Sequence, residues 1–341
     1  LKCLGEVKAG EVSSLCLKKG EALQIMTGAS VPAGTEAVVM VEYTERPNSD
    51  EVIILKSSIS KSNIALKGSE QRVGDLLVSK GDRVGSIELG GLASVGKSQI
   101  SLFKRPTVGI LTTGDELVEV DEKPGPGQIR NSNAYLLYSQ VLKIGGIPKI
   151  LSTATDNIKD LRNQINKGLR NDVLLISGGV SMGKYDLVEP VMSELGIQIY
   201  FESVTMRPGK PTVYARKGKQ FVFGLPGNPV STFVAFELFV NPVLKTLQGL
   251  GPGTHPIIRG RLEREVIEKS GRTTFLPAVV ADQGDGVKVD PVAWKGSADI
   301  FSMVGANGLI VVPLETERLS PGDLVDIILF EQMDNFPQCT F

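Results

Sequence analysis

The chain has 341 residues, which exceeds the usual size of one hydrophobic core, so two or three domains are expected. Hydrophobic residues make up 41% of it, and 38 glycines and 19 prolines indicate a globular, turn-rich protein. With a net charge of −1 and no basic block, binding of nucleic acid or of a membrane surface is not expected. Any anion site must therefore be a local concentration of positive charge.

The three cysteines, Cys3, Cys16 and Cys339, share no metal-ligand spacing, and their odd number argues against a disulfide framework. We therefore expect a reducing, cytoplasmic compartment. No apolar run approaches the roughly 20 residues of a membrane-spanning helix, and no signal peptide is visible. The single histidine, His255, lies in a glycine- and proline-rich linker, so neither a catalytic triad nor a zinc site is expected around it.

The first part of the chain has β character. Short strand-like runs separated by turn signals predict a small β-rich domain over residues 1–66, with strands at 23–26, 37–42 and 52–55. Residues 67–104 hold a polar loop around Glu70 and an apolar segment, 87–95, that could be a helix leading to the next domain. The pair Arg105-Pro106 marks a plausible boundary, because proline biases the preceding residue away from helix.

From Thr107 strands and helices alternate, which predicts a mostly parallel sheet covered on both faces. We expect Asp156 to cap one helix, Asn228 to cap the last one and Pro242 to kink it. The predicted strands are 108–112, 148–153, 173–177, 197–201, 212–216 and 221–225, and the helices are 132–144, 156–169, 187–195 and the stretch from 229.

Three loops follow predicted strands, and the ligand of an open α/β sheet binds beyond the carboxyl ends of its strands. These loops are 113–116, 178–185 and 226–228. The loop 207–211 reaches the same edge if strand 212–216 runs antiparallel to its neighbours. This topology predicts one pocket that holds Asp115, Glu116, Ser181, Asp186, Arg207 and Lys210.

Five of these six side chains also have a purely structural alternative. An aspartate at the start of a helix, as Asp186 is, often does no more than cap free backbone N–H groups. Asp115 could equally be a turn residue, and Glu116 a solvated surface charge. Taken singly, Arg207 and Lys210 fit surface cations. Convergence on one edge of the sheet favours the functional interpretation.

Residues 256–330 return to strand character, with runs at 257–266, 273–281, 287–292, 309–312 and 324–330 separated by turns. They predict a β-barrel-like C-terminal domain. Trp294 could lie in its core or at an interface, and a core position is favoured.

Several motifs occur in a fixed order along the chain. They are IMTGA at 25–29, TTGDEL at 112–117, GQIRNSN at 127–133, SGGVSMGKYD at 177–186, RPGKP at 207–211, LPGNPVS at 225–231, KGSAD at 295–299 and GANGL at 305–309. Together they resemble the molybdopterin molybdenumtransferase family, the MoeA-type enzymes related to gephyrin and the plant molybdenum insertases. The resemblance covers nearly the whole chain.

The resemblance implies a central MogA-like, molybdopterin-binding α/β domain at 105–250, flanked by a small β-rich N-terminal domain at 1–66 and a β-barrel-like C-terminal domain at 251–335. Residues 67–104 would be a linker or part of a helical domain. It also implies a homodimer, with a molybdopterin adenylyltransferase as a candidate partner.

The activity that the resemblance implies is insertion of molybdate into adenylylated molybdopterin, with Mg²⁺ as cofactor and release of AMP. By position in the family motifs, Asp186, Glu116 and Glu70 would hold the metal, and Asp115 and Lys210 would join Asp186 and Glu116 in catalysis. The residues expected to bind molybdate and molybdopterin are Thr27, Gly178, Gly179, Ser181, Arg207, Pro211, Pro226, Gly227 and Asn228.

The chain departs from the family at two of these positions. Glu70 matches by position and charge only, and Arg207 stands where a lysine is common, which keeps the charge but changes the donor geometry. An adenylyltransferase of the same pathway and a non-catalytic scaffold of gephyrin type remain alternatives. Molybdate and tungstate are nearly equal in size and charge, so the sequence leaves that choice open.

Overall fold

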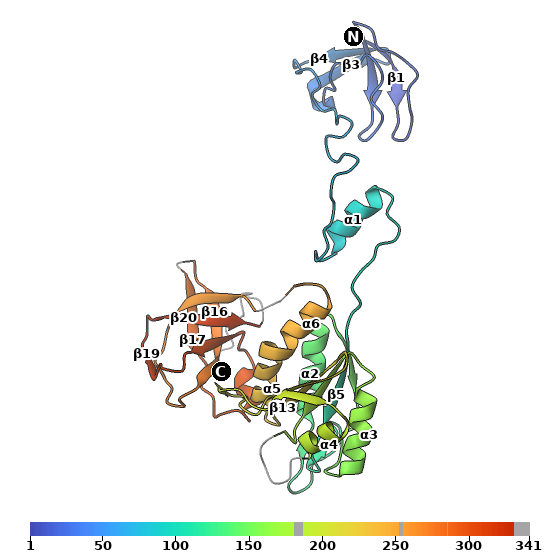
Figure 1. Cartoon of the computed structure of the whole chain (residues 1–341). Coiled ribbons are helices and arrows are strands. Elements are labelled where there is room, and N and C mark those ends of the chain that lie inside the picture. The colour runs from blue at the N-terminus through green and yellow to red at the C-terminus, as the bar shows by residue number, and fades with distance from the viewer. Residues whose placement is uncertain (181–186, 252–254, 285, 331–341) are drawn as a thin grey trace. The chain divides into compact units, whose positions relative to one another are not determined.

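The computed structural model describes residues 1–180, 187–251, 255–284 and 286–330. The chain divides into two compact units, Leu1–Leu77 and Val78–Phe341 (Figure 1). The finer bounds drawn from the sequence stay predictions.

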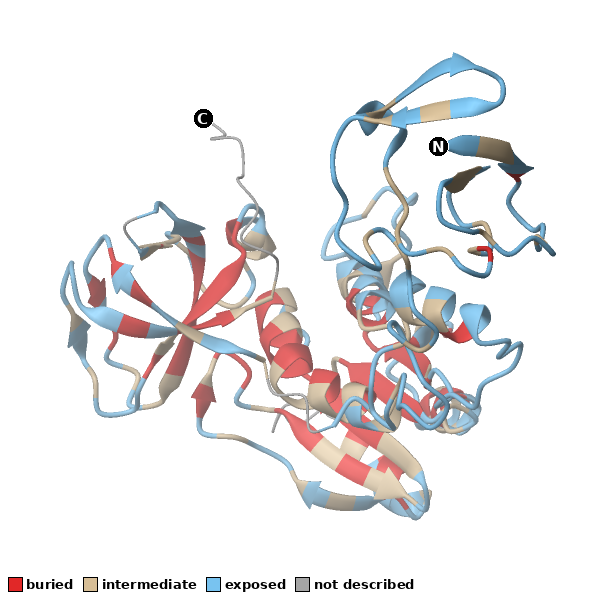
Figure 2. Ribbon diagram, turned by 90° about the horizontal axis from the view of Figure 1, so that it is seen from above, coloured by how far each residue is buried: buried red, intermediate tan, exposed pale blue. Residues whose placement is uncertain are grey.

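The first unit is a small β domain. Its sheet has the order β2-β1-β4-β3, with β1 and β2 parallel and the other neighbours antiparallel. Figure 2 shows few buried residues in this domain. Val7 is one of them, and it belongs to the buried apolar residues of the chain. The elements are β1 (Lys2–Val7), β2 (Glu21–Ile25), the 3₁₀ turn η1 (Val41–Tyr43), β3 (Thr44–Asn48) and β4 (Glu51–Ile54).

The strand predicted at 37–42 is wrong. The backbone N–H of Val38 donates to Ser62 O at 3.0 Å, and the Asn63 side chain donates to Val38 O at 2.8 Å. Because a loop satisfies these groups, the segment has no need of a strand neighbour. It ends in η1, where Tyr43 N bonds to Met40 O.

The second unit begins with the helix α1 (Ser86–Ser94), close to the helix predicted at 87–95. Its central sheet follows, with the order β10-β12-β13-β9-β5-β8. Only β12 runs antiparallel to its neighbours within this sheet, as the reversal predicted around 207–219 requires. The strands are β5 (Thr107–Thr112), β8 (Ile147–Ile150), β9 (Val173–Ser177), β10 (Gln198–Phe201), β12 (Val213–Lys217) and β13 (Gln220–Leu225).

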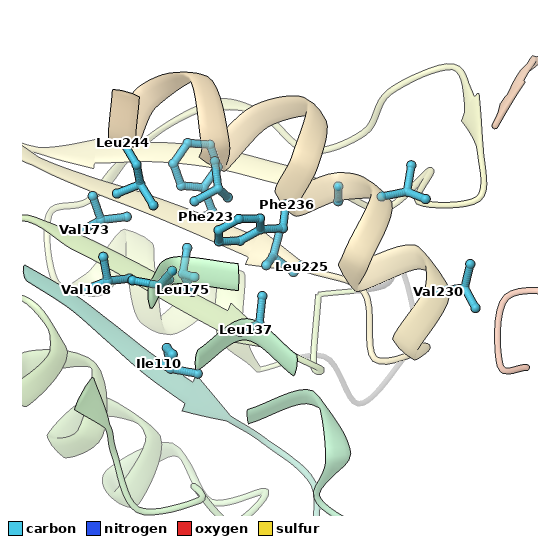
Figure 3. Packing of buried hydrophobic residues seen from close by; sticks show 14 of the residues in the cluster. Val108, Ile110, Leu137, Val173, Leu175, Phe223, Leu225, Val230, Phe236 and Leu244 are labelled. Carbon is cyan, nitrogen blue, oxygen red and sulfur yellow. The ribbon is translucent and has the colours of Figure 1, made fainter. Parts of the chain in front are cut away.

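Helices cover both faces of the sheet because its central strands are apolar on both sides. On β9, Val173 and Leu175 pack with α2, α5 and α6, while Leu174 and Ile176 pack with α3 and α4. Figure 3 shows the first of these clusters from close by. The helices are α2 (Ser132–Lys143), α3 (Ile158–Gly168), α4 (Val188–Glu194), α5 (Pro229–Ala235), the π-helical turn η2 (Phe236–Val240) and α6 (Asn241–Leu247).

Two predicted helix caps are corrected. The side chain of Asn157, not Asp156, caps α3 by accepting from Lys159 N at 2.8 Å. Asn157 is the residue directly before the helix, where an Asx side chain reaches the free N–H groups. Asn228 stands at the N-cap position of α5, but its side chain donates to Ser297 Oγ at 2.8 Å and makes no cap bond.

The stretch Pro229–Leu247 is long and apolar enough to cross a membrane by length and composition, with a hydropathy of 1.3. The expectation that no apolar run reaches this length therefore does not hold. However, 56% of the stretch is buried inside the protein, and Val230, Phe236 and Leu244 lie in the core (Figure 3). Its hydrogen-bonding pattern changes to π-helical just ahead of Pro242, and the kink expected at Pro242 stays a prediction.

The C-terminal part of this unit is a closed β-barrel, as predicted. Each strand pairs with the next one in the order β16-β17-β14-β20-β18, and β18 also pairs with β16, which closes the ring. The strands are β14 (Ile257–Leu262), β16 (Thr273–Asp282), β17 (Val287–Pro291), β18 (Gly308–Val312) and β20 (Leu324–Leu329).

The barrel and the α/β domain share apolar packing. Phe275, Leu309 and Ile328 of the barrel belong to the same buried cluster as Val234 and Phe236 of the long helix. The short strand β11 also leaves the α/β domain and pairs in parallel with β16. The remaining elements are β6 (Leu117–Val118), β7 (Ile129–Arg130), β11 (Met206–Arg207), β15 (Val266–Ile267), η3 (Ile300–Met303) and β19 (Arg318–Leu319).

A buried carboxylate lies on the π-helical turn. Glu237 is 5% exposed and accepts from Gln140 Nε2 at 2.6 Å, Asn241 Nδ2 at 2.8 Å and His255 Nε2 at 2.8 Å. Burial by itself raises the pKa of Glu237, but the hydrogen bonds from His255, Asn241 and Gln140 outweigh it and hold the pKa below its usual value. The linker histidine is thus tied to the core helix.

Replacing Glu237 with alanine is expected to lower the free energy of unfolding by about 2 to 4 kcal/mol at neutral pH, because three buried donors lose their acceptor. The folded-state pKa lies below the unfolded value, so this contribution is complete above about pH 5 and is lost as the pH falls. Urea unfolding at several pH values measures both effects. The control Glu194→Ala removes an exposed pair with Arg162 and should cost less than about 1 kcal/mol. A difference that does not shrink between pH 7 and 4 would contradict the role of the charge.

Candidate functional site

A pocket of about 770 Å³ opens at the carboxyl ends of β5, β9 and β13, beside the N-termini of α2 and α5. It lies at the edge of the sheet that the sequence pattern predicts. The lining residues are 112–114, 116–117, 129–133, 156, 177–180, 207–211, 226–229, 231, 272, 294 and 296–297.

Glycines bring three backbone segments together in this pocket. A Cβ on Gly178, whose φ is +94°, would lie 2.7 Å from Thr113 O, and a Cβ on Gly179 would lie 2.9 Å from Thr113 Oγ1. A Cβ on Gly227 would lie 3.8 Å from the Gly178 Cα, so Gly227 faces the same point. No side chain larger than hydrogen fits at 178 without movement of the β5 loop.

Asn133 on α2 joins these loops. Its Nδ2 donates to Gly227 O at 2.7 Å and to Ser177 Oγ at 2.9 Å. Its Oδ1 is buried and, among the described residues, has no hydrogen-bond partner, and the same is true of Thr113 Oγ1. Buried polar atoms are nearly always hydrogen-bonded, so two such atoms in one pocket wall fit a site that a polar ligand completes.

Positive charge exceeds negative charge around the pocket. Among the described lining residues, four side chains are cationic and two are carboxylates, in a chain whose net charge is −1. This is the local concentration of charge that an anion site needs. The cations are Arg130, Arg207, Lys210 and Arg272, and the carboxylates are Glu116 and Asp156.

Arg207 is held by the barrel. Its Nη1 donates to Glu268 Oε1 at 2.8 Å, and its guanidinium lies 5.7 Å from the ring centroid of Trp294. Arg272, on the same side, approaches the Met206 carbonyl with Nη1 at 3.5 Å. The barrel therefore contributes charged and aromatic side chains to a pocket that begins on the α/β sheet.

The structure brings most of the predicted site residues of the α/β domain together. Asp115 is an exception, because its Oδ1 accepts from Asp156 N at 3.0 Å and the residue does not line the pocket. Ser181 and Asp186 lie outside the described residues. Those lining the pocket are Glu116, Gly178, Gly179, Arg207, Lys210, Pro211, Pro226, Gly227 and Asn228.

Thr27 and Glu70 belong to the first unit. Thr27 follows β2, and Glu70 lies in the loop after Gly68. Both are exposed in that unit, and their place in the site stays a prediction.

Sequence reasoning assigned no role to several lining residues. Asn133 was visible within the motif at 127–133, but its contacts to two other loops were not. Ser297 lies within the motif at 295–299, but nothing local pointed to Arg272 or Trp294, since their place depends on how the barrel packs against the α/β domain. The residues in question are Thr113, Arg130, Asn133, Arg272, Trp294 and Ser297.

The fold is an α/β domain joined to a barrel, with a pocket at the carboxyl edge of the sheet, and the family comparisons identify its class. Residues 109–246 match the family described as a probable molybdopterin binding domain. Residues 2–96 match the MoeA N-terminal region (domain I and II), and residues 259–330 match the MoeA C-terminal region (domain IV).

The relatives are more particular. The chain is 33% identical over 334 residues to the molybdopterin molybdenumtransferase of Bacillus subtilis, covering 96% of this chain and 77% of that protein. It is 32% identical over 329 residues to the enzyme of the same name from Staphylococcus epidermidis, covering 96% and 78%. A crystal structure of a molybdopterin biosynthesis MoeA protein from Pyrococcus horikoshii has a TM-score of 0.79 at 33% identity, covering 97% of this chain and 81% of that one. The chain therefore belongs to the molybdopterin molybdenumtransferase (MoeA) family.

This membership confirms the predicted family, the three-part fold and a transferase function in molybdenum cofactor biosynthesis. The roles of individual residues, the magnesium ion and the dimer stay predictions.

Substituting Gly178 with alanine tests the close approach of the loops. We expect a loss of about 1 to 3 kcal/mol from the positive φ alone, with further loss from the contact with Thr113 O. Gly227→Ala is the matched control, because its Cβ would meet nothing closer than 3.8 Å. Thermal unfolding and ligand binding measure the two variants. Equal stability of both would refute the steric argument.

Proposed function

We propose that this protein inserts molybdate into adenylylated molybdopterin and releases AMP. The observation that carries the proposal is the excess of cationic side chains around a glycine-floored pocket at the carboxyl edge of the sheet. Molybdate and the phosphates of an adenylylated substrate are anions of the kind that such groups bind.

Each part of the pocket suits one feature of these substrates. On the loop 207–211, Lys210 supplies an ammonium donor on a flexible stem and Arg207 supplies a planar guanidinium, and both suit tetrahedral oxyanions. The loops at Gly178 and Gly227 let a bulky ligand come close to the backbone. We assign binding of molybdate and molybdopterin to these residues together with Gly179, Ser181, Pro211, Pro226 and Asn228, while Thr27 stays an expectation from the family resemblance.

A magnesium ion fits the donor set that faces the pocket. The described residues contain no group of three or more acidic, histidine or cysteine side chains placed to hold a metal ion, but Glu116 and Asp156 both line the pocket. Mg²⁺ usually keeps several waters and uses one or two carboxylates with substrate phosphates, so a large cluster is not needed. We propose Glu116 and Asp186 as ligands of an ion that would neutralise phosphate charge, while Glu70 stays an expectation from the family resemblance.

Two alternatives are less well supported. An adenylyltransferase of the pathway resembles the α/β domain alone, whereas Arg272, Trp294 and Ser297 of the barrel line this pocket. A non-catalytic scaffold would have no use for an unbalanced cluster of cations. The cytoplasmic location, the homodimer and an adenylyltransferase as the partner that supplies the substrate complete the proposal.

The proposed reaction predicts AMP release that depends on added molybdate or tungstate, with cofactor formed in step. Lys210→Ala should lower kcat/KM about 10- to 100-fold, because a charge-assisted contact to an anion is lost. Lys219→Ala is the control, since Lys219 is an exposed lysine on the β12–β13 turn. Tight binding of the nucleotide without turnover by the unmodified protein would instead support a scaffold.

Asp186 provides a second test. Asp186→Asn keeps the size of the side chain and removes its charge, so it should leave folding largely intact but lose molybdenum insertion. Circular dichroism melting and the AMP assay measure the two properties. Unchanged activity would remove Asp186 from the proposed catalytic residues.

A further inference from the structure

A buried carboxylate stands behind Arg207. Glu268 follows β15 in the barrel, and its side chain is 7% exposed. Its Oε1 accepts from Arg207 Nη1 at 2.8 Å and from Ser270 N at 2.9 Å. A buried carboxylate needs such partners, and the backbone bond from Ser270 fixes the position of the oxygen that Arg207 meets.

Three restraints act on Arg207 together. Its backbone pairs with Thr274 in the β11–β16 ladder, Nη1 is bound to Glu268, and the guanidinium lies 5.7 Å from the ring centroid of Trp294. The side chain is nevertheless 40% exposed and lines the pocket. Among the described residues, its Nε and Nη2 have no hydrogen-bond partner, so these N–H groups remain for a ligand.

An arginine on a free chain samples many rotamers, and ordering it on binding costs free energy. The three restraints already order Arg207. This favours recognition of a ligand through a planar pair of N–H donors over recognition through a diffuse positive charge. Because the negative charge of Glu268 balances the positive charge of Arg207, the pair contributes the fixed direction of its N–H donors more than net charge. Lys210 and Arg272 would then carry the net positive charge at this end of the pocket.

We propose that Glu268 is a positioning residue, which orients Arg207 to bind a tetrahedral oxyanion. This inference rests on the proposed function, because it names Glu268 as the group that orients one of the side chains proposed to bind the substrate. The oxyanion could be free molybdate or a phosphate of the nucleotide-bearing substrate, since both have the same geometry and both are anionic.

The competing role is purely structural. The pair also ties the barrel to the α/β domain, and a tie of that kind would affect stability without regard to ligand. The two roles differ in one respect. Positioning requires arginine at 207, because the ammonium group of lysine has no fixed fork to orient.

The test is a double-mutant cycle with Glu268→Gln and Arg207→Lys, read by calorimetric binding of molybdate alone and of AMP alone. Glu268→Gln should weaken one of these ligands about 3- to 10-fold in the arginine background and by less than about 2-fold in the lysine background. The ligand that weakens identifies the oxyanion source. In turnover, KM for the corresponding substrate, molybdate or adenylylated molybdopterin, should rise by more than kcat falls.

Glu265→Gln is the matched control, since Glu265 lies on the same stretch and pairs with Arg318 away from the pocket. It should change neither binding nor KM. If the unmodified protein binds the ligand, an equal loss of affinity in both backgrounds, or no loss in either, would overturn the positioning role of Glu268. If the unmodified protein binds neither molybdate nor AMP, the proposed function fails and this inference fails with it.

Discussion

The pairing of β11 with β16 is the interaction on which the rest of this site depends. Met206 and Arg207 leave the α/β domain and align with Thr273 and Thr274 of the barrel. A shared apolar cluster backs this short ladder, with Phe275 of β16 packed into the same core as Phe236 of the long helix. Because this ladder joins the two domains, a cation loop of one and an acid of the other can be set at hydrogen-bond distance.

The pocket combines close backbone approach with an uneven distribution of charge. Glycines at 178, 179 and 227 remove side-chain bulk at the point where three strands end. Asn133 then fastens two of the loops to each other through Ser177 Oγ and Gly227 O. Around this rigid floor the cations exceed the carboxylates, although the whole chain is nearly neutral. The floor supplies shape and the rim supplies attraction for an anionic substrate.

Much of this arrangement could be predicted from the sequence because it has local causes. Alternating apolar runs gave the parallel sheet, and the short turn at 217–219 implied the one reversed strand, β12. The errors were also local. The Asx cap of α3 moved by one residue to Asn157, and the run at 37–42 found loop partners in place of a strand. Short runs carry too little periodic pattern to decide such cases.

The parts that could not be predicted depend on contacts between distant segments. Arg272, Trp294 and Ser297 enter the pocket only because the barrel docks where it does, and no spacing in the sequence encodes that docking. Glu268 is similar, since its partner Arg207 is in another domain. Conversely, Asp115 has the right position in its motif, yet its carboxylate binds the backbone of Asp156 beside the pocket.

The late position of the barrel in the chain has a consequence for biosynthesis. Domains generally fold from the N-terminus as the ribosome releases them, so the α/β sheet can form before β16 has been made. Until then Arg207 has neither its ladder partner nor Glu268, and the pocket lacks one wall. A nascent or truncated chain could thus fold its sheet and still be unable to hold its substrate. Binding competence would arise only once β16 has been made.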